Sequence, residues 1–258
     1  MDPGAGRRAD RAAVPCPVHA ARDLVPAAPA GVQPAGAGAP GRGAGRGRDR
    51  GVAGGDLGEG SRLAAATGAY VCFEDEAGQN LRPPKARTWA PRGRTPVVRV
   101  SGKGSGRVSV AGLVCLKPGA RGRLFYRVRV HRGRKGERRS MSEADYADLI
   151  TAAHQQLQAP VILIWDRLNT HVSAVMRAFT GAHPGWLTEV RLPAYAPELN
   201  AAEGACAAMK ASLGNLAVRD VDQLAAVMKN RLKRIQYRPV LIEAFLAQTG
   251  LTFEPQPP

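Results

Sequence analysis

The stretch "VILIWDRLNTH" (161–171) constrains the possible folds more than any other part of the sequence. Its apolar residues, mostly β-branched, predict a strand buried on both faces, which is typical of a parallel sheet covered by helices. The strand runs directly into a carboxylate, Asp166. Because ligands of open α/β sheets gather at the carboxyl ends of parallel strands, we expect Asp166 to lie at a functional edge.

The segments around this strand predict a mixed sheet with helices on both faces. Strands are expected in "AYVCFEDE" (69–76), "PVVRVSG", "GRVSVAGLVCL", "GRLFYRVRVH" and "WLTEVRLP" (186–193). Short glycine-rich turns join the second to fourth of these and indicate an antiparallel meander. Residues 69–75, 161–166 and 186–192 are expected to run parallel.

Helical periodicity is present between these strands and after them. A helix is expected over 140–157 with Ser142 as its cap. A second helix is expected to begin near Val172, capped by Asn169 or Thr170, and residues 201–250 are expected to be helical for the most part.

The first 60 residues have a different composition from the rest of the chain. They contain no Lys, Ile, Phe, Trp, Tyr, Asn, Ser or Thr, and Gly, Ala, Pro and Arg dominate. Such a segment has too little bulky apolar surface to offset the entropy of ordering. We therefore expect a disordered arm over residues 1–65, which could also be a non-native translated frame, and one folded domain over 66–258.

The formal net charge of the 258-residue chain is +16, which favours a polyanionic partner, most often nucleic acid. The cysteines Cys16, Cys72, Cys115 and Cys206 form no CxxC pair and are expected to be reduced thiols of a cytosolic protein. Apolar runs are too short for a membrane span, so no membrane partner is expected.

Three interpretations of Asp166 compete. A magnesium-binding aspartate of a P-loop NTPase needs a GxxxxGK[ST] loop, and "SGKGSG" (101–106) lacks that spacing. A structural Asp166 would cap the next helix or pair with Arg167. A shared metal site would need carboxylates from other segments.

Asp75 and Glu203 are the candidate partners for such a site. Asp75 ends the strand of "FEDEAG", and Glu203 follows the proline-punctuated loop "LPAYAPELN" in the first turn of a helix. Three carboxylates repel one another without a cation, so Asp166→Asn is expected to be neutral or mildly stabilising without metal. Hard oxygen ligands favour Mg²⁺ or Mn²⁺, and two such ions suit phosphodiester chemistry.

The blocks "FEDEAG", "RTWAPRGRTPVV", "WDRLNTH" and "LPAYAPELNAAEG" resemble those of Tc/mariner-related insertion-sequence transposases of the DDE superfamily. The resemblance covers residues 66–250 and implies an RNase H-like catalytic domain with a mixed sheet of five strands and flanking helices. The family's three acids fall on Asp75, Asp166 and Glu203, which would bind two Mg²⁺ or Mn²⁺ ions. The implied activity is cleavage of DNA at transposon ends and strand transfer into target DNA at TA.

From this resemblance we also expect a homodimer on DNA and a cytoplasmic, nucleoid-associated protein. The chain departs from the family's pattern at Arg167 (usually Asn), Ala201 (usually Pro) and Cys206 (usually aromatic), and residues 1–60 show no pattern of the family's N-terminal DNA-binding helices. These departures leave a catalytically inactive, DNA-binding remnant as the alternative function.

The run "HRGRKGERR" (131–139) is a candidate DNA-backbone contact, or else a solvated hairpin tip. The residues assigned to DNA binding are Arg132, Arg134, Lys135, Arg138, Arg139 and His171. For His171, a local hydrogen bond at the start of a helix is the alternative. Glu74, Glu76 and Glu198 are not expected to be ligands, although Glu76 would replace Asp75 if the strand register were shifted by one.

Overall fold

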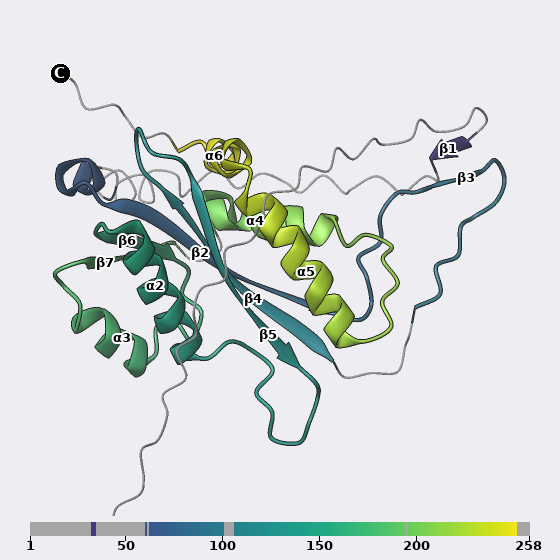
Figure 1. Ribbon diagram of the computed structural model, residues 1–258, viewed down its shortest axis with the longest axis horizontal. Helices are drawn as coiled ribbons and strands as arrows, with labels where there is room; N and C mark the ends of the chain where they lie inside the picture. The colour runs from purple at the N-terminus through teal and green to yellow at the C-terminus, as the bar shows by residue number, and fades with distance from the viewer. Residues whose placement is uncertain (1–31, 35–59, 61, 101–105, 194–195, 252–258) are drawn as a thin grey trace, which may run out of the picture.

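The computed structural model describes residues 32–34, 60, 62–100, 106–193 and 196–251 (Figure 1). Most of the predicted N-terminal arm lies outside these residues, so its disorder stays a prediction. Residues 62–67 are helical, and Ala64 is 2% exposed within the hydrophobic core. This last part of the predicted arm is therefore folded together with the domain.

A mixed sheet of five strands, in the order β5-β4-β2-β6-β7, forms the centre of the fold. Its strands are β2 (Tyr70–Asn80), β4 (Arg107–Leu116), β5 (Arg123–His131), β6 (Val161–Trp165) and β7 (Leu187–Arg191). β4 is antiparallel to β2 and β5, whereas β2, β6 and β7 run parallel. The predicted parallel strands and the RNase H-like class of sheet are confirmed.

Helices cover both faces of the sheet (Figure 1). The helices are α2 (Glu143–Leu157), α3 (Ala174–Gly181), α4 (Ala201–Ala211), α5 (Val221–Gln236) and α6 (Pro239–Gln248), with a short 3-10 helix, η1 (Pro197–Leu199), before α4. α2 and α3 pack on one face, and α4, α5 and α6 pack on the other. The prediction of helices on both faces is thus confirmed.

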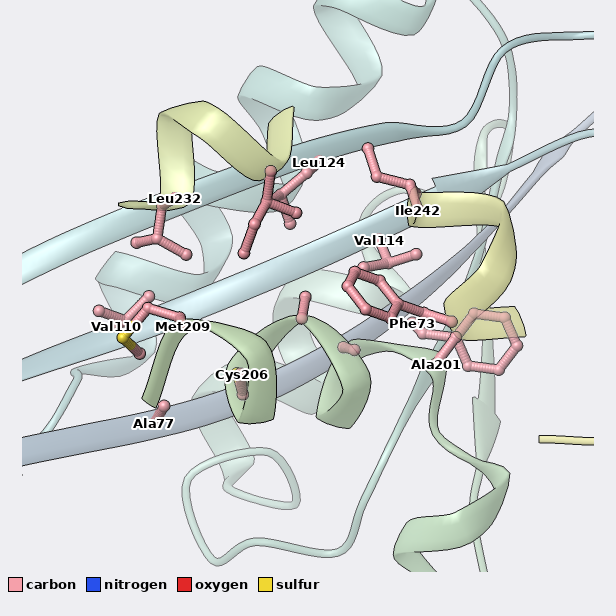
Figure 2. Packing of buried hydrophobic residues seen from close by; sticks show 14 of the residues in the cluster. Phe73, Ala77, Val110, Val114, Leu124, Ala201, Cys206, Met209, Leu232 and Ile242 are labelled. Carbon is pink, nitrogen blue, oxygen red and sulfur yellow. The ribbon is translucent and has the colours of Figure 1, made fainter. Parts of the chain in front are cut away.

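Alternation along the strands divides the apolar side chains between two core layers. In β6, Ile162 and Ile164 contact the layer under α4–α6, whereas Leu163 and Trp165 contact the layer under α2 and α3. This explains why "VILIW" shows no polar alternation, because both of its faces are covered. Figure 2 shows the α4-side layer, where Phe73 and other sheet residues meet helical side chains.

Two helix starts test the predicted caps. The Ser142 side chain accepts a hydrogen bond from the Asp145 amide and forms a capping box, so this cap is confirmed. The next helix, α3, begins at Ala174, two residues after the predicted start near Val172, but the predicted caps are wrong because Ser173 caps it. The side chains of Ser173 and Asp166, rather than Asn169 or Thr170, organise this turn.

The predicted strand over "PVVRVSG" (96–102) is also wrong within the residues described. Residues 96–100 have no strand pairing, and Val97 is 83% exposed. Both neighbours of β4 are already occupied, by β2 and β5, so the sheet has no place beside it for this segment. Instead β2 extends to Asn80, and β3 (Trp89–Pro91) pairs antiparallel with β1 (Val32–Pro34).

Candidate active site

The prediction that Asp75 ends its strand is wrong, because β2 continues to Asn80 and Asp75 lies midway along it. The Asp75 carboxylate faces α4, where Cys206, Glu203 and Lys210 are its neighbours. The pKa of Asp75 is raised to about 6, first because the group is buried and then because the negative charges of Glu203 and Asp166 are near. A hydrogen bond with the Cys206 thiol and the charge of Lys210 oppose this rise. Asp75 is thus coupled to both of the other predicted acids.

Asp166 follows the last residue of β6, at the carboxyl end of the parallel strand. Its Oδ1 accepts hydrogen bonds from the Leu168 amide at 2.9 Å and from His171 Nδ1 at 2.8 Å. The His171 hydrogen bond, followed by the Leu168 amide, lowers the pKa of Asp166. The side chain is 59% exposed and does not cap α3. It organises the turn locally and remains open to solvent, so the structural and functional interpretations are compatible.

Glu203 lies in the first turn of α4, and Asn200 fixes where that helix begins. The Asn200 side chain accepts from the Ala202 amide at 3.0 Å and donates to the Glu74 carbonyl at 2.7 Å. The buried Asn200 therefore caps α4 and ties it to β2 directly beside Asp75. No role was predicted for Asn200 from the sequence, although Asn200 and Glu203 have the N-cap and N3 spacing of a capping box.

The three predicted acids line one cavity of about 370 Å³. The other lining residues are Arg167, Leu168, Leu192, Pro193, Ala196, Pro197 and Asn200. Glu76 lies on the opposite face of the sheet, where its carboxylate accepts a hydrogen bond from the Tyr146 hydroxyl at 2.8 Å. The strand register therefore places Asp75, and not Glu76, with Glu203.

The sequence profile of a family described as DDE superfamily endonuclease matches residues 70–225. The chain belongs to this family. The matched segment contains Asp75, Asp166 and Glu203, and it spans the whole central sheet. No curated protein sequence matches the chain.

Solved structures of Mos1 transposase are similar to this DDE family member. The Mos1 paired-end complex with the left transposon end is 14% identical with a TM-score of 0.48, and the match covers 78% of this chain and 62% of that one. The catalytic domain of Mos1 mariner transposase is 15% identical with a TM-score of 0.39, covering 78% and 93%. This chain therefore spans less than two thirds of the Mos1 chain in the DNA complex.

On the other side of β2, a buried polar pair adjoins the acids of this DDE protein. His171 is 2% exposed, and its Nε2 lies 3.2 Å from Glu74 Oε2. Burial, followed by the charges of Asp75 and Asp166, raises the pKa of Glu74. The predicted DNA contact of His171 is not supported by this geometry, because the side chain is 2% exposed and both ring nitrogens face carboxylates of the same chain.

The predicted DNA-contacting residues of the basic run lie in the exposed segment after β5. Arg132 pairs with both carboxylate oxygens of Asp222 on α5, at 2.6 and 2.8 Å. Arg138 pairs with Glu143 at 3.0 Å. For the side chains of Arg134, Lys135 and Arg139, the described residues provide no ion pair. The segment thus combines internally paired and solvent-facing cations.

The chemistry of the acid cluster fits a divalent metal ion. Burial and the nearby negative charges of Glu203 and Asp166 disfavour the ionised form of Asp75, and a hard cation relieves both penalties. Across the described ranges, no three His, Cys, Asp or Glu side chains already stand where they could hold one ion. Side-chain rotation within the shared cavity would therefore accompany binding. No helix in the described part of the chain is both long and apolar enough to cross a membrane.

Proposed function

We propose that the chain is a transposase catalytic domain that cuts DNA at the ends of a mobile element and joins it to target DNA. The observation that carries this proposal is the convergence of Asp75, Asp166 and Glu203, from β2, β6 and α4, on one cavity. Acids on separate elements repel one another, and fold stability alone does not explain their convergence. Membership of the DDE endonuclease family supports the same chemistry.

Asp75, Asp166 and Glu203 would hold two Mg²⁺ or Mn²⁺ ions. When bound, such ions stabilise charge on the attacking and leaving oxygens of an in-line phosphoryl displacement. In the first step a water oxygen bonds to phosphorus and the P–O3′ bond breaks, which frees a 3′-hydroxyl. In the second step that hydroxyl attacks a target phosphodiester, so each step forms one P–O bond and breaks one.

The remaining lining residues would position the DNA. Arg167 lies beside Asp166 at the cavity, where its guanidinium can pair with a phosphate adjacent to the cut. Leu168, Leu192 and Pro193 supply apolar wall that limits water beside the reacting phosphate. Asn200 acts indirectly, by holding the first turn of α4 against β2.

We further propose that the protein acts as a homodimer on DNA in the cytoplasm, associated with the nucleoid. Two transposon ends must be cut, and each chain carries one set of acids, so two copies supply the required sites. The net charge of +16 supports DNA as the polyanionic partner.

The test is cleavage of a supercoiled plasmid carrying the element's own ends by the purified full chain. Nicking and strand joining with Mg²⁺ or Mn²⁺, absent in EDTA and absent in Asp75→Asn and Glu203→Gln, are expected. A wild type that binds the DNA but never cuts it in either metal would instead establish the catalytically inactive remnant. The departures from the family pattern at Arg167 and Cys206 are the residues to which such a loss of activity would be traced.

A further inference from the structure

Glu74 is a buried carboxylate that the proposed chemistry does not use. Its side chain is fully buried, and neither oxygen has a conventional hydrogen bond among the residues described. The polar group that faces it is the His171 imidazole, with Nε2 at 3.2 Å from Oε2. Since an unpaired buried carboxylate is costly, its presence directly behind the acid cluster calls for a role.

The imidazole of His171 is held rigidly between two carboxylates. Its ring stacks on Trp165, with centroids 4.4 Å apart and planes at 10°, and the ring of Tyr146 meets it edge-on at 4.7 Å. One ring nitrogen faces Glu74, and the other lies 2.8 Å from Asp166 Oδ1. Packing therefore fixes the ring plane, and the two carboxylates fix what each nitrogen faces.

The fixed imidazole of His171 restrains one carboxylate oxygen of Asp166. Both donors to this carboxylate, His171 Nδ1 and the Leu168 amide, bind the same oxygen, Oδ1. Within the described residues no donor binds Oδ2, and Asp166 lines the cavity. The turn thus immobilises one oxygen and leaves the other free for a ligand.

We propose that His171 is a positioning residue that orients Asp166 for metal binding, and that Glu74 in turn orients His171. This inference rests on the proposed function, in which Asp166 is a metal ligand. Outer partners of this kind hold a ligand in its binding orientation, and their loss weakens metal binding by about 10-fold to 100-fold in well-studied sites. The buried Glu74 is then a support for the site, placed on the face of β2 opposite Asp75.

Two substitutions of His171 distinguish the contributions of its two ring nitrogens. His171→Asn keeps a nitrogen donor near the Nδ1 position, toward Asp166, whereas His171→Gln keeps one near Nε2, toward Glu74. The matched control is His183→Asn, at a histidine after α3 that lies outside the cavity. Mn²⁺ binding to the full chain is measured by calorimetry without DNA, and thermal melting in EDTA reports folding.

We expect His171→Asn to bind Mn²⁺ within about threefold of the wild type and His171→Gln to bind about tenfold or more weakly. Glu74→Gln should retain most of the affinity, because its amide can still pair with Nε2, whereas Glu74→Leu should lose it. Equal affinity of His171→Gln and the wild type overturns the inference. Equal loss in the Asn and Gln variants also overturns it, because packing rather than the donor would then matter.

The same measurements separate this inference from the proposed function. A wild type that binds Mn²⁺ but never cuts DNA contradicts the function, while the ranking of the His171 variants still decides the positioning role. A wild type that fails to bind Mn²⁺ overturns the inference directly. If His171→Gln melts well below the wild type in EDTA, its weaker Mn²⁺ binding could be due to loss of folding. The comparison of Mn²⁺ affinity between Glu74→Gln and Glu74→Leu then decides the positioning role.

Discussion

Asn200 donates a hydrogen bond from its side-chain amide to the Glu74 carbonyl, 2.7 Å away, and so joins the start of α4 to the middle of β2. Glu74 and Asp75 are adjacent in the chain, and Glu203 lies three residues after Asn200. One buried side chain therefore sets the separation between two of the three acids. This relationship makes Asn200 part of the site although it does not carry a charge.

Asn200→Ala removes both the helix cap and the tie to β2. We expect the free energy of unfolding to fall by about 2 kcal/mol, from a lost cap of about 1 kcal/mol and a buried carbonyl left without its partner. We also expect weaker stabilisation by Mn²⁺, because Glu203 loses its fixed position. Urea unfolding with and without Mn²⁺ measures both effects.

Ser173→Ala is the matched control, since Ser173 caps α3 and does not line the cavity. It should lose about 1 kcal/mol of stability from the cap alone and keep the full response to Mn²⁺. If the two variants respond alike to Mn²⁺, Asn200 acts only as a cap.

The raised pKa of Asp75 predicts a pH-dependent stability without metal. Its pKa is 3.8 in a model peptide and about 6 in the fold, so the folded state holds the proton more tightly. The contribution of Asp75 to stability is therefore fully present below about pH 4 and is lost as the pH rises through 6. In EDTA, the wild type should lose up to about 3 kcal/mol over this window relative to Asp75→Asn.

Denaturant melts at pH 4, 5, 6 and 7 measure this difference, with saturating Mn²⁺ as a second series. The metal should abolish the decline, because bound cation favours the ionised carboxylate. Parallel stability curves for the wild type and Asp75→Asn in EDTA would show that Asp75 ionises freely and is not buried among like charges.

The sheet and the identity of the acids were predictable because they depend on local patterns. "VILIW" lacks polar alternation, which requires cover on both faces. The parallel pairing of β2 with β6 ends at Phe73 and Ile164, so Asp75 and Asp166 each lie two residues beyond it. In the same way, the proline-rich loop before Ala201 marks the start of the helix that carries Glu203.

The features that the sequence did not predict depend on contacts between residues that are distant in sequence. Val97 and Val98 have the composition of a strand, yet both edges of β4 are occupied by β2 and β5. The role of Asn200 requires a partner 126 residues away, and the burial of His171 depends on Trp165 and Tyr146 packing around it. Local propensity contains no information on such contacts.

Asp166→Asn should abolish DNA cleavage, because one ligand charge is lost. The structure changes the expected effect on stability without metal. Repulsion among three acids predicted a neutral or mildly stabilising change, but the hydrogen bond from His171 lowers the pKa of Asp166, so the fold favours its charged form. We therefore expect a mild loss in EDTA at neutral pH, below about 1 kcal/mol because the carboxylate is 59% exposed.

Thermal melting of the wild type and of Asp166→Asn in EDTA measures the sign and the size of this stability change. Acidification through the lowered pKa of Asp166 should remove the difference, because its contribution to stability is fully present above the ordinary aspartate pKa and is lost as the pH falls through the folded-state pKa. A variant that melts higher than the wild type at neutral pH would show that repulsion from Asp75 and Glu203 dominates.

The exposed cations after β5 differ in how much charge they can offer to DNA. Arg134 and Lys135 have no ion pair in the described structure, whereas Arg132 is held by both oxygens of Asp222. We expect the double substitution Arg134→Ala and Lys135→Ala to weaken DNA binding and to reduce the slope of log affinity against log salt by about 2, because two fewer phosphates are neutralised. Arg132→Ala should change this slope by less than about 0.5, because breaking its pair with Asp222 removes a cation that is already neutralised.

Fluorescence anisotropy of a labelled duplex over a series of salt concentrations measures both slopes. Because the metal ligands are unchanged, Mn²⁺ binding should stay at the wild-type level in both variants. An unchanged slope in the double variant would mean that this segment is a solvated hairpin tip, and that the DNA lies on another part of the basic surface.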